Sequence, residues 1–183
     1  MTGPVAASTT FRVRAATAAD AGAIIELYRT VAAPPGGLAR ESDEISPRYV
    51  HGFLDRALED GVALLAVPLE PSHAVPLAGE LHCYRMGPRS FAHVLGELTV
   101  AVHPRWQGRG VGRALFKALL EEVEQNRPGI ARVELIARES NERAIHLYET
   151  LGFRREGRLE GRVRRPDGVI EADIPMAWHR NQP

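Results

Sequence analysis

The sequence has one cysteine, no surplus of charge of either sign and no long apolar run. The single thiol, Cys83, excludes an internal disulfide and fits a buried residue in a reducing cytoplasm. Lysine plus arginine equal aspartate plus glutamate at 23 each, which argues against a broad surface for nucleic acid or anionic membrane. No apolar run approaches the ~20 residues that span a bilayer. We therefore expect a cytoplasmic protein without a nucleic-acid or membrane partner.

The sequence also lacks the signatures of a metal site and of a secretory leader. Its seven histidines are scattered from His51 to His179, with no cluster of His, Cys, Asp and Glu at ligand spacing. The start MTGPVAASTT has no basic segment followed by an apolar one. We expect no metal, and one domain over residues 11–179 between short tails at 1–10 and 180–183.

Helical and strand-like segments alternate along the chain without a repeat or an internal linker. Capping signals at Thr17 and Asp20, and again at Ser46 with Pro47, predict helices that end near Val31 and before Gly61. Further helices are predicted by apolar periodicity at 111–125 and 141–152, and strands at 11–16, 62–69, 76–86, 91–102, 132–137 and, as a pair joined by a turn, 153–178. The class is mixed α/β, with a long loop at 32–44.

A glycine-rich stretch, HPRWQGRGVGRAL (103–115), stands between a predicted strand and a predicted helix. The unpaired amides at a helix start, together with the positive end of its dipole, favour an anion such as a phosphate. Arg105, Arg109 and Arg113 add cations beside it. A P-loop would need GxxxxGK followed by Ser or Thr, and a dinucleotide fingerprint would need glycine at Arg113. Neither spelling fits, although a tight turn alone would also use glycine.

The spelling that fits is QxxGxG, at Gln107, Gly110 and Gly112, and a second segment, NERAIHLYETLGF, runs from Asn141 to Phe153. Together the two segments resemble the pyrophosphate loop and the Asn–Tyr helix of the GNAT superfamily of acyl-CoA-dependent N-acyltransferases. The resemblance is strong from about residue 97 to 153. It implies a single-domain fold with a mixed, mostly antiparallel, twisted sheet of about six or seven strands flanked by about four helices.

The resemblance also implies a reaction, in which an amine attacks the thioester of acetyl-CoA directly. The acyl-CoA would be held by Val100, Ala101, Val102, Gln107, Gly108, Arg109, Gly110, Val111, Gly112, Arg113 and Asn141. Backbone NH groups of the strand at 100–102 would stabilise the oxyanion, and the hydroxyl of Tyr148 would protonate the leaving thiolate. Taken by itself, the spacing of Asn141 and Tyr148 is equally typical of a packing stripe on a helix.

The attacking amine must lose a proton, because an alkylammonium is almost entirely charged at pH 7. Glu97, on the strand that leads to the glycine loop, is the candidate base, and a solvated strand residue is the alternative interpretation. His82 and His93 lie on nearby predicted strands and are reserve candidates.

Three other interpretations stay open. Cys83 could accept the acyl group in a ping-pong mechanism, although the adjacent His82 would point to the other face of the strand. The chain could be an acyl-CoA-binding sensor that has lost catalysis, or a nucleotide-binding domain. The resemblance further implies that the last strand could pair with its copy in a homodimer.

The acceptor amine is not specified by the residues. Family members that acetylate protein N-termini commonly have a glutamate where this chain has Ile136, which speaks against that class. The acidic run Glu41, Asp43 and Glu44 lies in the loop that shapes the acceptor pocket in the family and could attract a cationic amine, although a solvated charge run explains it as well. A small molecule or a peptide remains compatible.

Overall fold

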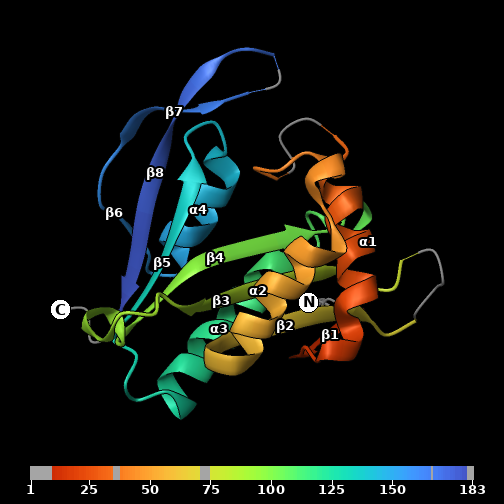
Figure 1. The fold of residues 1–183 in the computed structure, drawn as a ribbon, viewed down its shortest axis with the longest axis horizontal. Coiled ribbons are helices and arrows are strands. Elements are labelled where there is room, and N and C mark those ends of the chain that lie inside the picture. Colours follow the sequence, from red (N-terminus) through yellow and green to blue (C-terminus); the bar gives the residue numbers. More distant parts are fainter. Residues whose placement is uncertain (1–9, 35–37, 71–74, 166, 181–183) are drawn as a thin grey trace, which may run out of the picture.

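A twisted eight-stranded sheet organises the protein (Figure 1). The structure, a computed structural model, describes residues 10–34, 38–70, 75–165 and 167–180. Its strands are β1 (Phe11–Ala15), β2 (Gly61–Pro68), β3 (Gly79–Arg85), β4 (Val94–Val102), β5 (Arg132–Arg138), β6 (Arg154–Arg155), β7 (Leu159–Arg164) and β8 (Ile170–His179). The α-helices of the described residues are α1 (Ala21–Ala32), α2 (Pro47–Asp60), α3 (Val111–Asn126) and α4 (Glu142–Thr150).

The strands follow the order β1-β2-β3-β4-β5-β8-β6, with β7 also paired to β8. All neighbours are antiparallel except β4 and β5, which are parallel. The predicted class and mixed sheet are confirmed, and the strand number is slightly higher than expected. The excess comes from β6, which has two residues and is too short to produce a periodic pattern.

The sheet opens between β4 and β5. Their register contains only two residue pairs, Val94 with Arg132 and Leu95 with Val133. Beyond these pairs the two strands diverge, as Figure 1 shows. Backbone groups of β4 from Gly96 onward that point away from β3 therefore meet the opening instead of a neighbouring strand.

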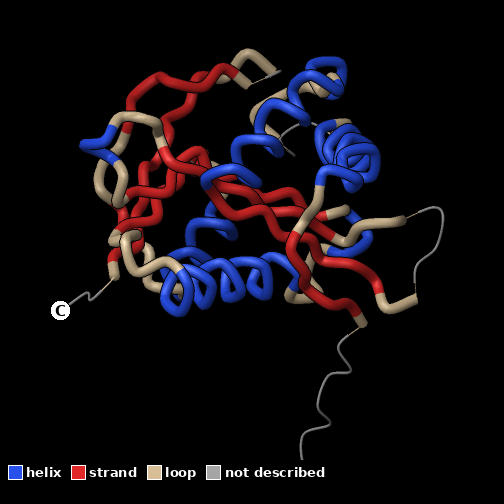
Figure 2. Tube along the Cα trace, turned by 60° about the horizontal axis from the view of Figure 1, so that its bottom comes forward, coloured by secondary structure: helices blue, strands red, loops and turns tan. Residues whose placement is uncertain are grey.

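Helices cover both faces of the sheet (Figure 2). On one face α1 and α2 pack over β2 and β3 around Ile24, Tyr28 and Phe53. On the other, α3 and α4 share one apolar cluster with β5 and β8 that includes Phe116 and Tyr148. The two clusters fix the position of the opening at the centre of the sheet.

The predicted local signals are found at the element ends. Thr17 and Asp20 form a capping box just before α1, and Ser46 accepts a hydrogen bond from the Tyr49 amide at the start of α2. Parts of the long loop and of the predicted tails lie outside the described residues. Arg180, assigned to the C-terminal tail by prediction, donates from Nε to the carbonyl oxygen of Ile130 at 2.8 Å.

The expected pairing of the last strand with its copy does not fit the sheet. β8 has β5 on one side, and β6 and β7 occupy its other side at different heights. A strand flanked on both sides has few backbone groups left to bond another chain.

Candidate active site

The glycine loop has a backbone that side chains with a Cβ rarely adopt. Gly108 has φ of 76° and Gly110, the N-cap of α3, has φ of 81°. Glycine adopts this left-handed backbone conformation at little cost in free energy. For a residue with a Cβ the same conformation costs about 1–2 kcal/mol. Gly112 is different, since an added Cβ would make only ordinary contacts, the nearest at 3.6 Å. Two of the glycines are thus required by the turn itself.

This turn presents free amides to the opening. The first hydrogen bond of α3 runs from the Ala114 amide to the carbonyl oxygen of Gly110 at 2.9 Å. The amides of Val111, Gly112 and Arg113 precede that bond and have no partner inside the helix. Gln107 closes the loop by donating its side-chain amide to the carbonyl oxygen of Val102 at 3.2 Å. The result is an amide cradle at the positive end of a helix dipole, suited to a phosphate.

Two arginines of the described chain frame this cradle. Arg113 donates to the Thr150 hydroxyl at 3.0 Å, which ties the start of α3 to the end of α4. Arg143, on α4, extends over the loop, because a Cβ added at Gly108 would lie 3.5 Å from its Nη2. The sequence analysis missed Arg143, although its place in the Asn141–Phe153 segment, next to the loop in a fold of this kind, could have suggested it.

A cavity of about 1090 Å³ extends from the glycine loop into the opening. It is lined by most of the predicted site residues, namely Val100, Val102, Gln107, Gly108, Gly110, Val111, Gly112, Arg113, Asn141 and Tyr148. Two motifs that are far apart in the sequence therefore lie around one space. That arrangement is what the motif-based prediction required.

Three predicted residues are not among those that line the cavity. Ala101 is buried on the opposite face, against the α1 and α2 cluster, as strand alternation dictates. The Arg109 guanidinium lies 5.4 Å from the ring centre of Trp106, which does line the cavity. Glu97 is exposed and has φ of 52° in a bulge of β4, where Glu97 and Leu98 stand opposite Cys83 alone.

Tyr148 projects from α4 into the wall of the cavity and packs against Phe116, with 4.9 Å between ring centres. Burial raises the pKa of its hydroxyl to about 12. The phenol is therefore protonated at neutral pH and has a proton to donate. Asn141 caps the same helix by accepting a hydrogen bond from the Ala144 amide at 3.2 Å.

The cavity is also lined by residues that the sequence analysis did not select. Val31 and Pro34 come from the end of α1, and Arg165, Asp167 and Glu171 from the β7–β8 hairpin. Glu171 accepts a hydrogen bond from the Ser140 amide with Oε2, while its Oε1 is buried without a hydrogen-bond partner among the described residues. No local pattern indicates that these segments meet. The acidic run at Glu41, Asp43 and Glu44 is exposed and is not part of the described lining.

A buried polar cluster lies under α1, on the opposite face of the sheet from α3. The Tyr28 hydroxyl donates to Glu80 Oε2 at 2.6 Å, and His82 Nδ1 lies 3.2 Å from Glu80 Oε1 and 3.3 Å from the Tyr28 hydroxyl. Glu80 is 0 % exposed and His82 2 %. His82 also stacks on Phe53, with 3.8 Å between ring centres. The sequence named His82 as a reserve base but missed its carboxylate partner.

Cys83 does not have the surroundings of a nucleophile. It is fully buried in the core on the α3 face of the sheet, and burial raises the pKa of its thiol to about 12. A thiolate is the reactive form, so this environment opposes the ping-pong alternative. In the ranges that the structure describes, no three His, Cys, Asp or Glu side chains gather as a metal group would require.

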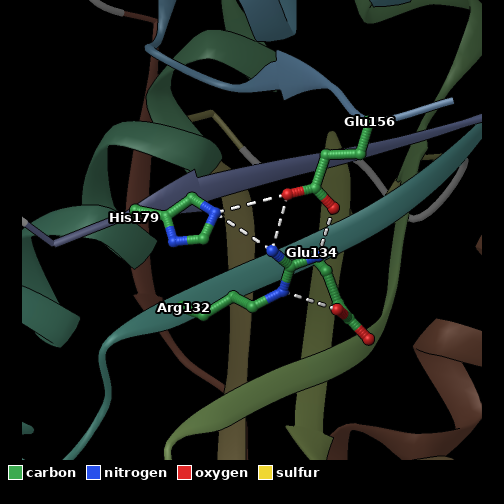
Figure 3. A network of polar contacts seen from close by, with 4 residues as sticks. All are labelled: Arg132, Glu134, Glu156 and His179. Carbon is green, nitrogen blue, oxygen red and sulfur yellow. Dashed lines mark hydrogen bonds and ion pairs between the residues drawn. The ribbon is translucent and has the colours of Figure 1, made fainter. Parts of the chain in front are cut away.

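A second polar network lies at the other end of β5 from the cavity (Figure 3). Arg132 pairs with Glu134 at 2.8 Å and with Glu156, and His179 Nε2 lies 3.3 Å from Glu156. The arginine holds the pKa of the Glu156 carboxyl at about 2. The network links β5, the segment after β6 and the end of β8, so it has a structural role at the sheet edge.

Comparison with protein families matches residues 37–153 to the acetyltransferase (GNAT) family. The [ribosomal protein bS18]-alanine N-acetyltransferase of Escherichia coli is 48% identical over 63 residues, which are 33% of this chain and 41% of that protein. The match thus spans about two fifths of this curated relative. Among the described residues, the helices include none with the length and apolar character to cross a membrane.

Solved structures share the fold. A GNAT-family acetyltransferase from Streptococcus pneumoniae aligns with a TM-score of 0.78 at 20% identity, covering 93% of this chain and 99% of that chain. YncA of Salmonella typhimurium, solved with its cofactor acetyl-CoA, aligns with a TM-score of 0.73 at 21% identity over 96% of each chain.

Proposed function

Because this chain belongs to the acetyltransferase (GNAT) family, we propose that it transfers the acetyl group of acetyl-CoA to a primary amine. The observation that carries the proposal is the joint lining of one cavity by the glycine loop and by Asn141 and Tyr148. An anion cradle alone would fit many phosphates. A cradle that shares one large cavity with a protonated phenol has room for an acyl donor and an amine acceptor together.

The residues present fit acetyl-CoA. The amides of Val111, Gly112 and Arg113 would hold the pyrophosphate, helped by the cation of Arg143. Gln107, Arg109 and Trp106 would border the same region, where Arg109 already lies over the indole. When bound, acetyl-CoA supplies an acetyl group activated as a thioester.

The protein's part in the reaction is to stabilise charge and to move protons. Backbone NH groups near Val100 to Val102, on the edge of β4 that is not paired with β5, would donate hydrogen bonds to the oxyanion. Tyr148, kept protonated by burial, would donate to the departing sulfur. Glu97 remains the sequence-based candidate for the base. It is exposed and does not line the cavity, so it would act through water.

The acceptor would enter the cavity between the end of α1 and the β7–β8 hairpin. The side chains there include Arg165, Asp167 and Glu171, which suits a polar amine. The similarity to a ribosomal-protein alanine acetyltransferase makes a peptide that begins with alanine one acceptor to test, beside small amines. Ile136, 49 % exposed on β5, stays the departure that speaks against N-terminal acceptors.

The test has two stages. Calorimetric titration with acetyl-CoA measures binding, and release of free thiol is then followed with an alanine-initiated peptide, a lysine peptide, spermidine and free amino acids. Turnover of at least one amine is expected. Binding without turnover of any amine would favour the acyl-CoA sensor, and binding of ATP in competition with CoA would favour a nucleotide-binding domain. A cytoplasmic location and a homodimer through a surface other than β8 are further parts of the proposal.

A further inference from the structure

The buried cluster of Tyr28, Glu80 and His82 has a composition that packing alone does not explain. Glu80 is 0 % exposed, and no lysine or arginine pairs with it among the described contacts. A buried carboxylate is expensive unless it accepts hydrogen bonds from donors that fit it. Its donors here are the Tyr28 hydroxyl at 2.6 Å and His82 Nδ1 at 3.2 Å.

These contacts select one form of the imidazole. Because the carboxylate can only accept, Nδ1 carries its hydrogen toward Glu80. In neutral His82 the free lone pair is then on Nε2. Stacking on Phe53, with ring planes 8° apart, holds the ring in this orientation. The arrangement, a carboxylate that orients an imidazole, is one that prepares a general base.

The free nitrogen is within reach of water. His82 Nε2 has no hydrogen-bond partner in the described chain. The buried side-chain atoms without a partner in that part are Arg85 Nε and Glu171 Oε1, and His82 Nε2 is not among them. The 3 % of the side chain that stays exposed agrees with this narrow access. A proton could therefore enter the cluster at Nε2 through water.

None of the three side chains of the cluster lines the cavity, but the cluster has neighbours that do, along β3 and along α1. His82 pairs with Thr99 of β4, the residue before Val100, which lines the cavity. Neighbouring strands are about 4.8 Å apart, and β4 is not paired with β5 at this height. His82 on β3 therefore lies one strand away from the open edge of β4. Tyr28 lies one turn before Val31, which also lines the cavity. The cluster is on the α1 and α2 face of the sheet, the face to which Val31 also belongs.

We propose that His82 takes the proton from the acceptor amine through water, with Glu80 and Tyr28 as positioning residues. One N–H bond of the ammonium breaks, and the freed nitrogen lone pair forms a bond to the thioester carbon. As the C–S bond breaks, a second proton passes from this nitrogen to the departing sulfur, which gives an amide and free CoA thiol. The first proton goes to Nε2. The proton then leaves to solvent. This inference rests on the proposed function and assigns the base to His82, where the sequence alone favoured Glu97.

The tyrosines and arginines around the cluster keep the same charge over the pH range of the test described below. The groups around the cluster are Tyr28 on α1, Tyr49 and Arg56 on α2, Arg40 before α2, Glu80 and Tyr84 on β3, and Glu97 on β4. Burial raises the pKa of each of the three tyrosines, so they remain neutral between pH 6 and 9. The two arginines remain charged over that range.

The experiment compares His82→Gln with the unsubstituted protein, using the most active amine of the panel. An alkylammonium with an ordinary pKa near 10.4 becomes neutral about tenfold more often with each pH unit. Without its base the variant can use only the fraction of the amine that is already neutral in solution. We expect its kcat/KM to be about 100-fold lower at pH 7 and only a few-fold lower at pH 9. A deficit of the same size at every pH would overturn the proposal in favour of a structural role.

Further variants separate the alternatives. Glu80→Gln and Tyr28→Phe should show the same pH-dependent deficit in weaker form, and they replace His82→Gln if it fails to fold. His51→Gln, on the exposed side of α2, is the matched histidine control and should change nothing. A pH-dependent deficit in Glu97→Gln with none in His82→Gln would assign the base to Glu97. The acetyl-CoA affinity of each variant should stay within about twofold, whereas failure of the proposed function would appear as no turnover in the unsubstituted protein.

Discussion

Replacing Tyr148 by phenylalanine should slow the chemical step without weakening acetyl-CoA binding. With the phenol pKa at about 12 and an ordinary thiol near 8.5, complete proton transfer to the thiolate would be uphill by about 3.5 units, or ~5 kcal/mol. The hydroxyl therefore acts mainly through a hydrogen bond to the developing charge, worth about 1.5–3 kcal/mol. The expected loss in kcat is roughly 10- to 150-fold.

The assay is thiol release at saturating acetyl-CoA, with affinity measured separately by calorimetry. Tyr84→Phe is the matched control, because this hydroxyl accepts a hydrogen bond from Arg56 and is not part of the described lining. Unchanged kcat in Tyr148→Phe would refute the donor role. A loss of affinity as large as the loss of kcat would show instead that the residue serves to shape the cavity.

Three further predictions follow from local geometry. Gly110→Ala, which forces a Cβ on a left-handed residue, should weaken acetyl-CoA binding about 5- to 30-fold by calorimetry, whereas Gly129→Ala, with open space around it, should not. Asp20, with its pKa lowered to about 2 by Arg14, stabilises the fold by about 2 kcal/mol above pH 4. Urea unfolding of Asp20→Asn should show this loss at pH 7, and the loss should vanish as the pH falls through 2. Cys83→Ala should retain full kcat, and an isolable acetyl-enzyme on the thiol would contradict this.

Local signals predicted the helices well because the residues that decide them are adjacent in sequence. The cap at Ser46, with its stop at Gly61, frames α2, and apolar periodicity defines α3. Strand order was not predictable in the same way, since pairing joins residues far apart. The divergence of β4 from β5 after Leu95 has no local signature, and neither does the two-residue β6. The feature that creates the cavity was therefore not predicted from the sequence.

The site residues show the same difference between local signals, which the sequence reveals, and contacts between distant residues, which it does not. The glycine loop and the Asn141–Tyr148 helix were found because each is a continuous motif. Strand alternation could have removed Ala101, whose side chain must oppose those of Val100 and Val102. The same alternation could have drawn attention to Glu80, a carboxylate on a strand whose apolar neighbours indicate burial. A charge at such a position needs a partner, and looking two residues along the same face leads to His82.

The neutral composition argued against a broad basic surface but could not reveal a local one. The cavity gathers Arg113, Arg138, Arg143 and Arg165 against Asp167 and Glu171. These six residues come from α3, β5, α4 and the β7–β8 hairpin, and Asp167 already pairs with Arg165 at 2.6 Å. Arg113 and Arg143 lie beside the amide cradle and would attract a pyrophosphate, whereas Glu171 would favour an ammonium. A chain without net charge can thus still offer cations to an anionic donor and a carboxylate to a cationic acceptor.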